Sequence, residues 1–286
     1  MDNLERIFVD VDDFCLLFEP AWQAHLIETG EKQRLRSSRL TNSEVMTLLI
    51  AFHQSGYRDF KTYYTRFVCR YWRHHFPCLV SYTRMLKLLQ SALVPLCSYM
   101  KGRRSQSTGI AYIDSTTLKV CHNLRIPRHK VFANEAQRGK GTMGWFYGFK
   151  LHLIVNDECG ILAVKVTPGN VDDRKPVLDM TDNLSGTLYG DKGYISNELK
   201  QGLCERDIHF VTGQRSNMKP QVISAWDNAM LGKRFIIETV FDQLKNMAQI
   251  DHTRHRSVVS FMVNLMAGLI AYTFQEKKPS INVTRL

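Results

Sequence analysis

The stretch GWFYGFKLHLIVNDECGILAVKVT, residues 144–167, decides the fold class. Its two halves are rich in β-branched and aromatic residues, and the polar run NDECG separates them, which is typical of two strands joined by a hairpin turn. A similar run, GIAYID at 109–114, precedes this stretch, and TLYGD at 187–191 and IHFVT at 208–212 follow it. Because helical stretches alternate with the later strands, the pattern predicts an α/β fold, a mixed sheet flanked by helices.

The chain before about residue 105 has a different pattern, because its apolar residues recur at helical spacing. Thr41 and Glu44, three positions apart, form a capping-box start for one helix. The run SYTRMLKLLQSALVPL at 81–96 predicts another helix, with Arg84 and Lys87 near its beginning. Two short helices in this order resemble a helix-turn-helix, in which the second helix enters the major groove of DNA.

Charge is distributed unevenly along the chain, whose net charge is +11. Residues 32–104 contain fourteen Lys and Arg against two acids, whereas residues 1–31 contain one base against eight acids. A basic excess packed into one segment indicates a polyanionic partner such as nucleic acid. The polar stretch at 101–109 indicates a linker. We therefore expect a helical, DNA-binding region over residues 1–105 and a sheet-containing domain over residues 106–286.

The cysteine pattern and the apolar runs indicate the compartment. Seven cysteines, an odd number without CxxC spacing, favour neither a disulfide framework nor a zinc ribbon. The N-terminal stretch MDNLERIFVDVDDF carries acids where a secretory signal would carry lysines. Ser260, Asn264 and Gly268 interrupt the longest apolar run, 258–274, which predicts a buried core helix. We expect a cytoplasmic, nucleoid-associated protein without membrane contact.

Three carboxylates stand at comparable places in the predicted sheet domain. Asp114 ends the first predicted strand, Asp191 ends the strand that leads into GDKGY, and Glu238 lies in a long helix predicted from Lys233 to about Met247. Ligand sites in such sheets lie outside the carboxyl ends of neighbouring strands. Three oxygen ligands there suit Mg²⁺. The arrangement predicts a pair of metal ions, about 3.5–4 Å apart, acting on a phosphodiester.

Each of these features also has an ordinary structural explanation. In the structural explanation of Asp191, its role is to cap the helix that starts near Ser196, without any metal. On the predicted long helix, Arg234, Glu238 and Lys245 share one face, and the first two match a solvated i, i+4 ion pair worth only about 0.3–0.5 kcal/mol. The opposite face is apolar, with Ile236, Val240, Leu244 and Met247. The combination of this helix with two strand-end aspartates favours the metal site.

The order of these motifs resembles the DDE transposases of bacterial insertion sequences, whose catalytic core has the RNase H-like fold. Arg234, Glu238 and Lys245 match the R, E and K of that group's Y-x2-R-x3-E-x6-K signature, and Leu231 stands where its tyrosine usually is. The resemblance covers about residues 108–275. It also implies that the helical N-terminal region holds the terminal inverted repeats of the element.

The resemblance implies a chemistry on double-stranded DNA. The three carboxylates would hold two Mg²⁺ ions, for which Mn²⁺ can substitute, so that water cuts at the transposon end and the freed 3′-OH attacks target DNA. Lys192, Arg234 and Lys245 would contact phosphates beside the scissile bond. Catalysis on two DNA ends is compatible with a homo-oligomer, although the sequence does not specify an oligomeric state.

A basic segment with little periodicity lies between the first two predicted strands. The segment at 121–144 contains Arg125, Arg128 and Lys130 and suits DNA contact, with a plain solvated loop as the alternative. Its GKGT stretch lacks the first glycine of a phosphate-binding loop, because Ala136 stands in that place. We therefore expect no use of ATP.

The residues leave other functions open. A metal-dependent nuclease of the same fold would share the metal site and never join strands. A DNA-binding regulator would keep the fold with an inactive site. The family motifs and the basic N-terminal region favour transposition, and the three intact acids argue against an inactive site. A hydrolase of small phosphate esters fits poorly with the concentrated basic segment.

Overall fold

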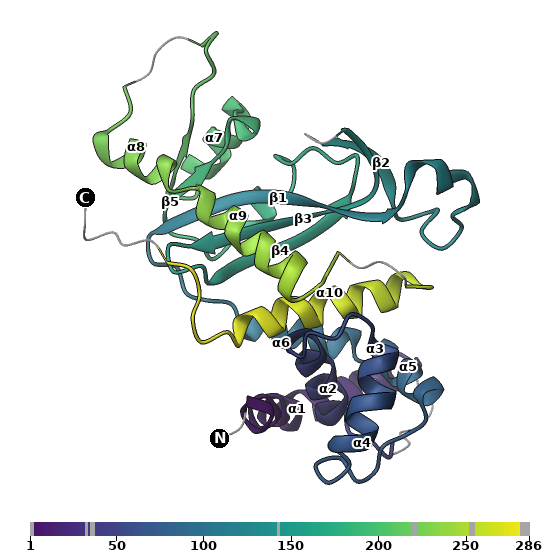
Figure 1. Ribbon diagram of the computed structural model, residues 1–286. Coiled ribbons are helices and arrows are strands. Elements are labelled where there is room, and N and C mark those ends of the chain that lie inside the picture. The colour runs from purple at the N-terminus through teal and green to yellow at the C-terminus, as the bar shows by residue number, and fades with distance from the viewer. Residues whose placement is uncertain are drawn as a thin grey trace. The chain divides into compact units, whose positions relative to one another are not determined.

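The computed structural model describes residues 3–31, 34, 38–141, 144–218, 222–251 and 255–280. The chain forms two compact units, one helical and one built on a sheet (Figure 1). Residues up to Arg103, together with Asn246–Ile250 and His255–Phe274, belong to the helical unit, and Arg104–Lys245 belongs to the sheet unit. The chain therefore returns to the helical unit after it has completed the sheet.

The sheet is mixed. Among the described residues its strands are β1 (Ile110–Cys121), β2 (Gln137–Gly141), β3 (Gly144–Asn156), β4 (Ile161–Pro168), β5 (Gly186–Gly190) and β6 (Ile208–Thr212). β3 pairs antiparallel with β1 and β4, whereas β5 pairs parallel with β1 and β6. β2 pairs with the first part of β3, ahead of β4. The order β4-β3-β1-β5-β6 is that of an RNase H-like core, which confirms the predicted fold class.

The hairpin predicted from residues 144–167 is formed by β3 and β4. Its turn is held by Asn156, whose Oδ1 accepts hydrogen bonds from the N–H groups of Glu158 at 3.2 Å and Gly160 at 2.7 Å. Cys159 in this turn has φ of 57°. An asparagine that bonds the backbone two residues on favours a turn, so the polar run NDECG specifies the reversal locally.

Different helices cover the two faces of the sheet. The described helical elements of this unit are η2 (Asn123–Arg128), η3 (Leu178–Met180), η4 (Lys192–Tyr194), α7 (Asn197–Cys204), α8 (Ala225–Gly232), α9 (Phe235–Asp242) and the first part of η5 (Gln243–Met247). Leu188 packs in a buried cluster with residues of α7. On the other face, the rings of Tyr112 and Tyr189 stack with centroids 5.6 Å apart, and the Tyr189 hydroxyl donates to Asp227 of α8 at 2.8 Å. These tyrosines therefore attach α8 to the sheet.

The long helix predicted from Lys233 to about Met247 is interrupted. α8 ends at Gly232, α9 begins at Phe235, and a π-helical turn follows from Gln243. Figure 1 shows α9 lying across β1. Because a π turn has a wider repeat than an α-helix, Met247 leaves the predicted buried face and is 58% exposed, whereas the other three residues predicted there are buried.

The helical unit contains the expected capping box but not the expected motif. Its helices are α1 (Asn3–Glu28), α2 (Asn42–Gln54), α3 (Phe60–Thr62), η1 (Tyr63–Val68), α4 (Cys69–Tyr71), α5 (Tyr82–Ser91), α6 (Leu93–Gly102) and α10 (Val258–Thr273). Thr41 and Glu44 bond each other's backbone N–H groups at the start of α2. Since a further helical segment separates α2 from α5, these two helices are not joined by the short turn of a helix-turn-helix.

The apolar run at 258–274 forms α10, a core helix as predicted. It packs against α2, α5 and α6. The packing is tight at Gly268, where an added Cβ would lie 2.4 Å from Cγ2 of Ile250. His53 of α2 donates from Nδ1 to the Ala248 carbonyl at 2.6 Å, and burial lowers the pKa of His53 to about 4. Within the described residues, no helix is long and apolar enough to cross a membrane.

Candidate metal and DNA site

Asp114 lies on β1, Asp191 directly follows the neighbouring parallel strand β5 in extended backbone, and both are on the same face of the sheet. The register of β1 and β5 pairs Tyr112 with Tyr189, and the two aspartates follow two positions later on each chain. Because side chains alternate along a strand, both point to the side of the tyrosine stack. Asp114 does not end its strand as predicted, since β1 continues opposite Leu153 and beyond. It stands where β1 and β5 part.

Asp191 follows the last residue of β5 and caps the short turn η4. Its Oδ1 accepts a hydrogen bond from the Gly193 N–H at 2.8 Å. The next helix, α7, is capped by a serine instead. Local packing explains both flanking glycines. A Cβ on Gly190 would lie 3.2 Å from the Phe210 ring, and one on Gly193 would lie 2.9 Å from the Asp191 carboxylate.

Arg234 connects the first and third carboxylates. It precedes α9, and its Nη1 donates to Asp114 Oδ2 at 3.2 Å while its Nη2 donates to Glu238 Oε1 at 3.1 Å. The Asp114 side chain is 20% exposed, and that of Glu238 is 59% exposed. The i, i+4 ion pair expected on the helix is therefore present, and the same guanidinium also ties the start of α9 to β1.

The Asp114 carboxyl has a raised pKa of about 6. Burial is the main cause, because it withdraws water from the charged form. The charges of Asp191 and Glu238 raise this pKa further, whereas the Ser115 N–H, 2.8 Å from Oδ1, and the Arg234 guanidinium lower it. Asp191 and Glu238 thus both lie within electrostatic range of Asp114. A group of like charges in this position is one that a bound cation stabilises.

The donor set suits a hard divalent cation such as Mg²⁺ or Mn²⁺, because it consists of carboxylate oxygens. Within the part of the chain that the structure describes, no three His, Cys, Asp or Glu side chains already surround one metal position. The Arg234 guanidinium bonds one oxygen of Asp114 and one of Glu238. The residues therefore fit the cation chemically, and Arg234 competes with it for two of the carboxylates.

The two lysines predicted to contact phosphate differ in their surroundings. Lys192 is exposed and follows Asp191 directly, and its backbone carbonyl accepts a hydrogen bond from Arg215 at 3.1 Å. Lys245 is half-buried and donates to the Thr117 carbonyl on β1 at 3.0 Å. Burial lowers the pKa of the Lys245 ammonium. Lys245 therefore also fixes η5 against β1, a role that the sequence did not indicate.

The other predicted DNA contacts form separate exposed surfaces. Arg125, Arg128 and Lys130 are exposed on the arm, residues 122–141, which lies beyond the end of β1 that is away from β5 (Figure 1). Thr142, the end of the GKGT stretch, lies outside the described residues. Arg84 and Lys87 are exposed one turn apart on α5 of the helical unit. The three arm residues therefore lie apart from the carboxylates, which stand near the paired ends of β1 and β5.

Tyr194 is a residue near the carboxylates that the sequence reasoning missed. It is buried, and after burial itself the charges of Asp114, Asp173 and Asp191 raise the pKa of its hydroxyl. Asp173 in turn accepts a hydrogen bond from Lys150 at 2.9 Å. The sequence signal that could have identified Tyr194 was its place as the last residue of GDKGY, because this tyrosine anchors the turn in the core.

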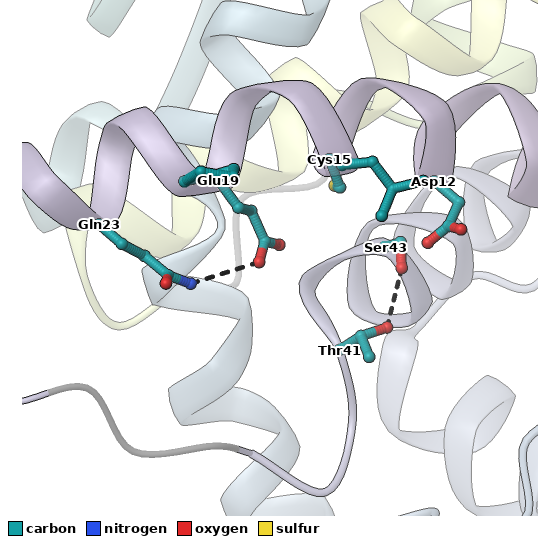
Figure 2. A pocket seen from close by; sticks show the side chains of 8 residues that line it. Asp12, Cys15, Glu19, Gln23, Thr41 and Ser43 are labelled. Atoms are coloured by element: carbon teal, nitrogen blue, oxygen red, sulfur yellow. Dashed lines mark hydrogen bonds between the residues drawn. The ribbon is translucent and has the colours of Figure 1, made fainter.

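A pocket of about 250 Å³ in the helical unit is a poor candidate for this chemistry (Figure 2). Asp12 and Glu19 of α1 line it, and their charges repel phosphate. Thr41 and Ser43 lie on the α2 side and bond each other at 2.8 Å. Burial raises the pKa of Cys15 to about 12, so its thiol stays protonated.

Comparison with known proteins identifies the sheet unit. Among curated proteins, no sequence matches the chain. Residues 104–258, more than half of the chain, match the family model described as a transposase DDE domain. That span contains Asp114, Asp191, Glu238 and the arginine that links two of them. A match of this extent shows the family, and the chain belongs to the DDE-type transposases.

Proposed function

We propose that this chain binds the terminal inverted repeats of an insertion sequence, cuts the DNA there and transfers the freed 3′-OH into target DNA. The observation that carries the proposal is the double contact of Arg234 with Asp114 and Glu238, on the face of the sheet that Asp191 shares. It supports the view that three carboxylates distant in sequence act as one site.

In this proposal, Asp114, Asp191 and Glu238 bind two Mg²⁺ ions, with Mn²⁺ as a substitute. Bound cations supply Lewis-acid stabilisation of the charge that develops on the scissile phosphate and lower the pKa of an attacking water or hydroxyl. Asp114 has to lose its proton to act as a ligand, and with a pKa of about 6 it is mostly ionised at neutral pH. Because water and then the 3′-OH attack phosphorus directly, no nucleophilic side chain is required.

The basic side chains of the site bind and orient the DNA. The forked N–H donors of a guanidinium match two phosphate oxygens. Arg234 can therefore release its hydrogen bonds to the carboxylates and bind a phosphate of the scissile strand instead. An ammonium has three N–H donors, so Lys245 retains two beyond the one it gives to Thr117. Lys192 stands beside Asp191 and adds a further point charge.

More distant basic residues supply contacts along the flanking DNA. Arg125, Arg128 and Lys130 on the arm and Arg84 and Lys87 on α5 are all exposed. Contacts of this kind bind phosphates of any DNA sequence, and they position the duplex on the protein. In this proposal the helical unit holds the terminal repeats, and a homo-oligomer brings two element ends together in the nucleoid.

The test uses purified wild type, Glu238→Gln and the matched control Glu198→Gln, an exposed acid on α7. Each protein is incubated with supercoiled plasmid, short duplexes from the ends of the flanking element, and Mg²⁺, and new DNA junctions are sequenced. We expect junctions with wild type and Glu198→Gln and none with Glu238→Gln.

The other outcomes point to different functions. Metal-dependent cutting without junctions would identify a nuclease that does not join strands. Binding without cutting in Mg²⁺ and Mn²⁺ would identify an inactive regulator. Junctions formed equally well by Glu238→Gln would remove Glu238 from the site.

A further inference from the structure

The hairpin of β2 and β3 presents an exposed indole beside two cations. Trp145, near the start of β3, is 52% exposed, and the guanidinium carbon of Arg138 on β2 lies 4.8 Å from the centroid of its ring. Lys140 pairs with Trp145 across the two strands and is also exposed. Burial of a large aromatic side chain contributes much favourable free energy. An indole held at the surface between cations is therefore a candidate contact for a ligand.

Close backbone contacts fix this hairpin to the sheet. Gly139 lies between the two cations in sequence and faces inward, where an added Cβ would lie 2.0 Å from the carbonyl oxygen of Gly169. The side-chain amide of Asn123 donates to the Trp145 carbonyl at 2.8 Å. Because side chains alternate along a strand, the inward glycine places both cations on the outward side. The surface is therefore formed before any ligand arrives.

The charge around this surface favours a polyanion that also carries flat rings. Residues 115–156 contain seven Lys and Arg and one acid, Glu135. Aromatic rings on a basic surface bind single-stranded nucleic acid by stacking on its bases, and arginine adds a cation–π contribution. A base inside a duplex has both faces covered by its neighbours. Away from a duplex end, the indole can therefore stack only on a base that is unpaired and unstacked.

We propose that Arg138, Lys140 and Trp145 form a stacking platform for an unpaired base of the DNA bound at the carboxylates. That this DNA is a transposon end rests on the proposed function. Asp114 pairs with Leu153 of β3, and Trp145 precedes Leu153 by eight residues, or about 26 Å of extended strand. That length is less than one turn of duplex DNA, about 34 Å, so the terminal turn of DNA cut at the carboxylates is long enough to reach the platform.

The test measures binding by the full-length protein in EDTA, so that it does not depend on catalysis. The probes are a blunt 20-base-pair duplex and the same duplex with a four-nucleotide single-stranded overhang that contains 2-aminopurine. The proteins are wild type, Trp145→Ala, Trp145→Phe, Arg138→Gln and the matched control Trp226→Ala, a 45% exposed indole on α8.

We expect wild type to bind the overhang duplex more tightly than the blunt one and to quench the 2-aminopurine. Trp145→Ala should weaken overhang binding by about 5- to 150-fold, the range that stacking of one base predicts, and leave blunt-duplex binding unchanged. Arg138→Gln should have a smaller effect in the same direction. Trp145→Phe should retain most of the preference, and Trp226→Ala should behave as wild type.

Equal wild-type affinity for the two probes, without quenching, would overturn the platform. An equal loss on both probes in Trp145→Ala, shared by Trp145→Phe, would also overturn it, because it would assign Trp145 a structural role. Failure of the proposed function would appear separately, as an overhang preference that depends on Trp145 in a protein that makes no strand-transfer junctions.

Discussion

Opposing influences act on the charge of Asp114. Burial and the neighbouring carboxylates Asp191 and Glu238 favour its neutral form, whereas the Ser115 N–H and Arg234 favour its charged form. Burial outweighs the ion pair, because the pKa rises to about 6 from an ordinary 3.8. Between these two pH values the native protein binds more protons than the unfolded chain. The free energy of unfolding therefore falls as pH rises from about 4 to about 6 and stays lower above that range.

We expect Asp114→Asn to stabilise the metal-free protein at pH 8, because asparagine removes a buried charge that is unfavourable there. The gain in the free energy of unfolding should be at most about 3 kcal/mol and should vanish near pH 4, where Asp114 is already protonated in the native state. Urea unfolding in EDTA at both pH values measures it, with Glu198→Gln as the control. A variant that is less stable than wild type at pH 8 would show that the contact with Arg234 outweighs burial.

Arg234 holds the oxygens that a metal would use. In Arg234→Gln these carboxylates lose their positive partner, so we expect the free protein to bind Mn²⁺ about fivefold more tightly, the effect of removing about 1 kcal/mol of competition from a partly exposed ion pair. Electron paramagnetic resonance of free Mn²⁺ measures this affinity without DNA. Arg206→Gln, which breaks a surface pair with Asp182, is the matched control. Weaker Mn²⁺ binding by Arg234→Gln alone would mean that the arginine orients the carboxylates for the metal.

The strands were predictable where the signal is local, and the helices only in part. The hairpin of β3 and β4 follows from strand composition and the Asn156 turn. That β1 continues past Asp114 could not be read from the sequence, because it depends on pairing with residues of β3 that follow 26 to 37 positions later. The break before α9 and the π turn from Gln243 were also not predicted, because the sequence analysis assumed a continuous α-helix with 100° per residue. The contact of Arg234 with Asp114 depends on all of these features, so the sequence indicated the acids but not their link.

The inner contact of β2 gives a test of how the hairpin is held. Gly139→Ala would force a Cβ to within 2.0 Å of the Gly169 carbonyl oxygen, an overlap with backbone that cannot move aside cheaply. We expect a loss of about 1–3 kcal/mol in the free energy of unfolding, with faster hydrogen exchange concentrated in β2. Gly141→Ala, two residues along the same strand, would meet Thr117 Cγ2 at an ordinary 3.6 Å and should change little. Equal stability of the two variants would contradict the packing argument.

At the scale of the molecule, the structural units are not continuous segments of the sequence. The helical unit takes up Asn246–Ile250 and α10 from the end of the chain, since α10 packs on α2, α5 and α6. Composition predicted α10 as a core helix, but not which core it joins, because an apolar run does not specify its partner. The assignment of DNA binding to the helical region and of catalysis to the sheet unit therefore remains a prediction, and charge gives a means to test it.

If α5 contacts DNA, its exposed cations should determine part of the salt dependence of binding. Arg84 and Lys87 lie on the outward side of α5, while Met85 and Leu89 face the core, so replacing both cations by glutamine leaves the packing intact. Each lost phosphate contact lowers the slope of log affinity against log salt by about 0.9, so the double variant should lose about 2.

The matched control is the double variant Lys200→Gln and Arg206→Gln, which removes two exposed cations from the sheet unit and should leave the slope unchanged. Fluorescence anisotropy with one labelled element end across a salt series measures both variants. An equal fall in slope for the two pairs would mean that net charge rather than α5 governs binding, and no fall for either would take α5 out of the DNA interface.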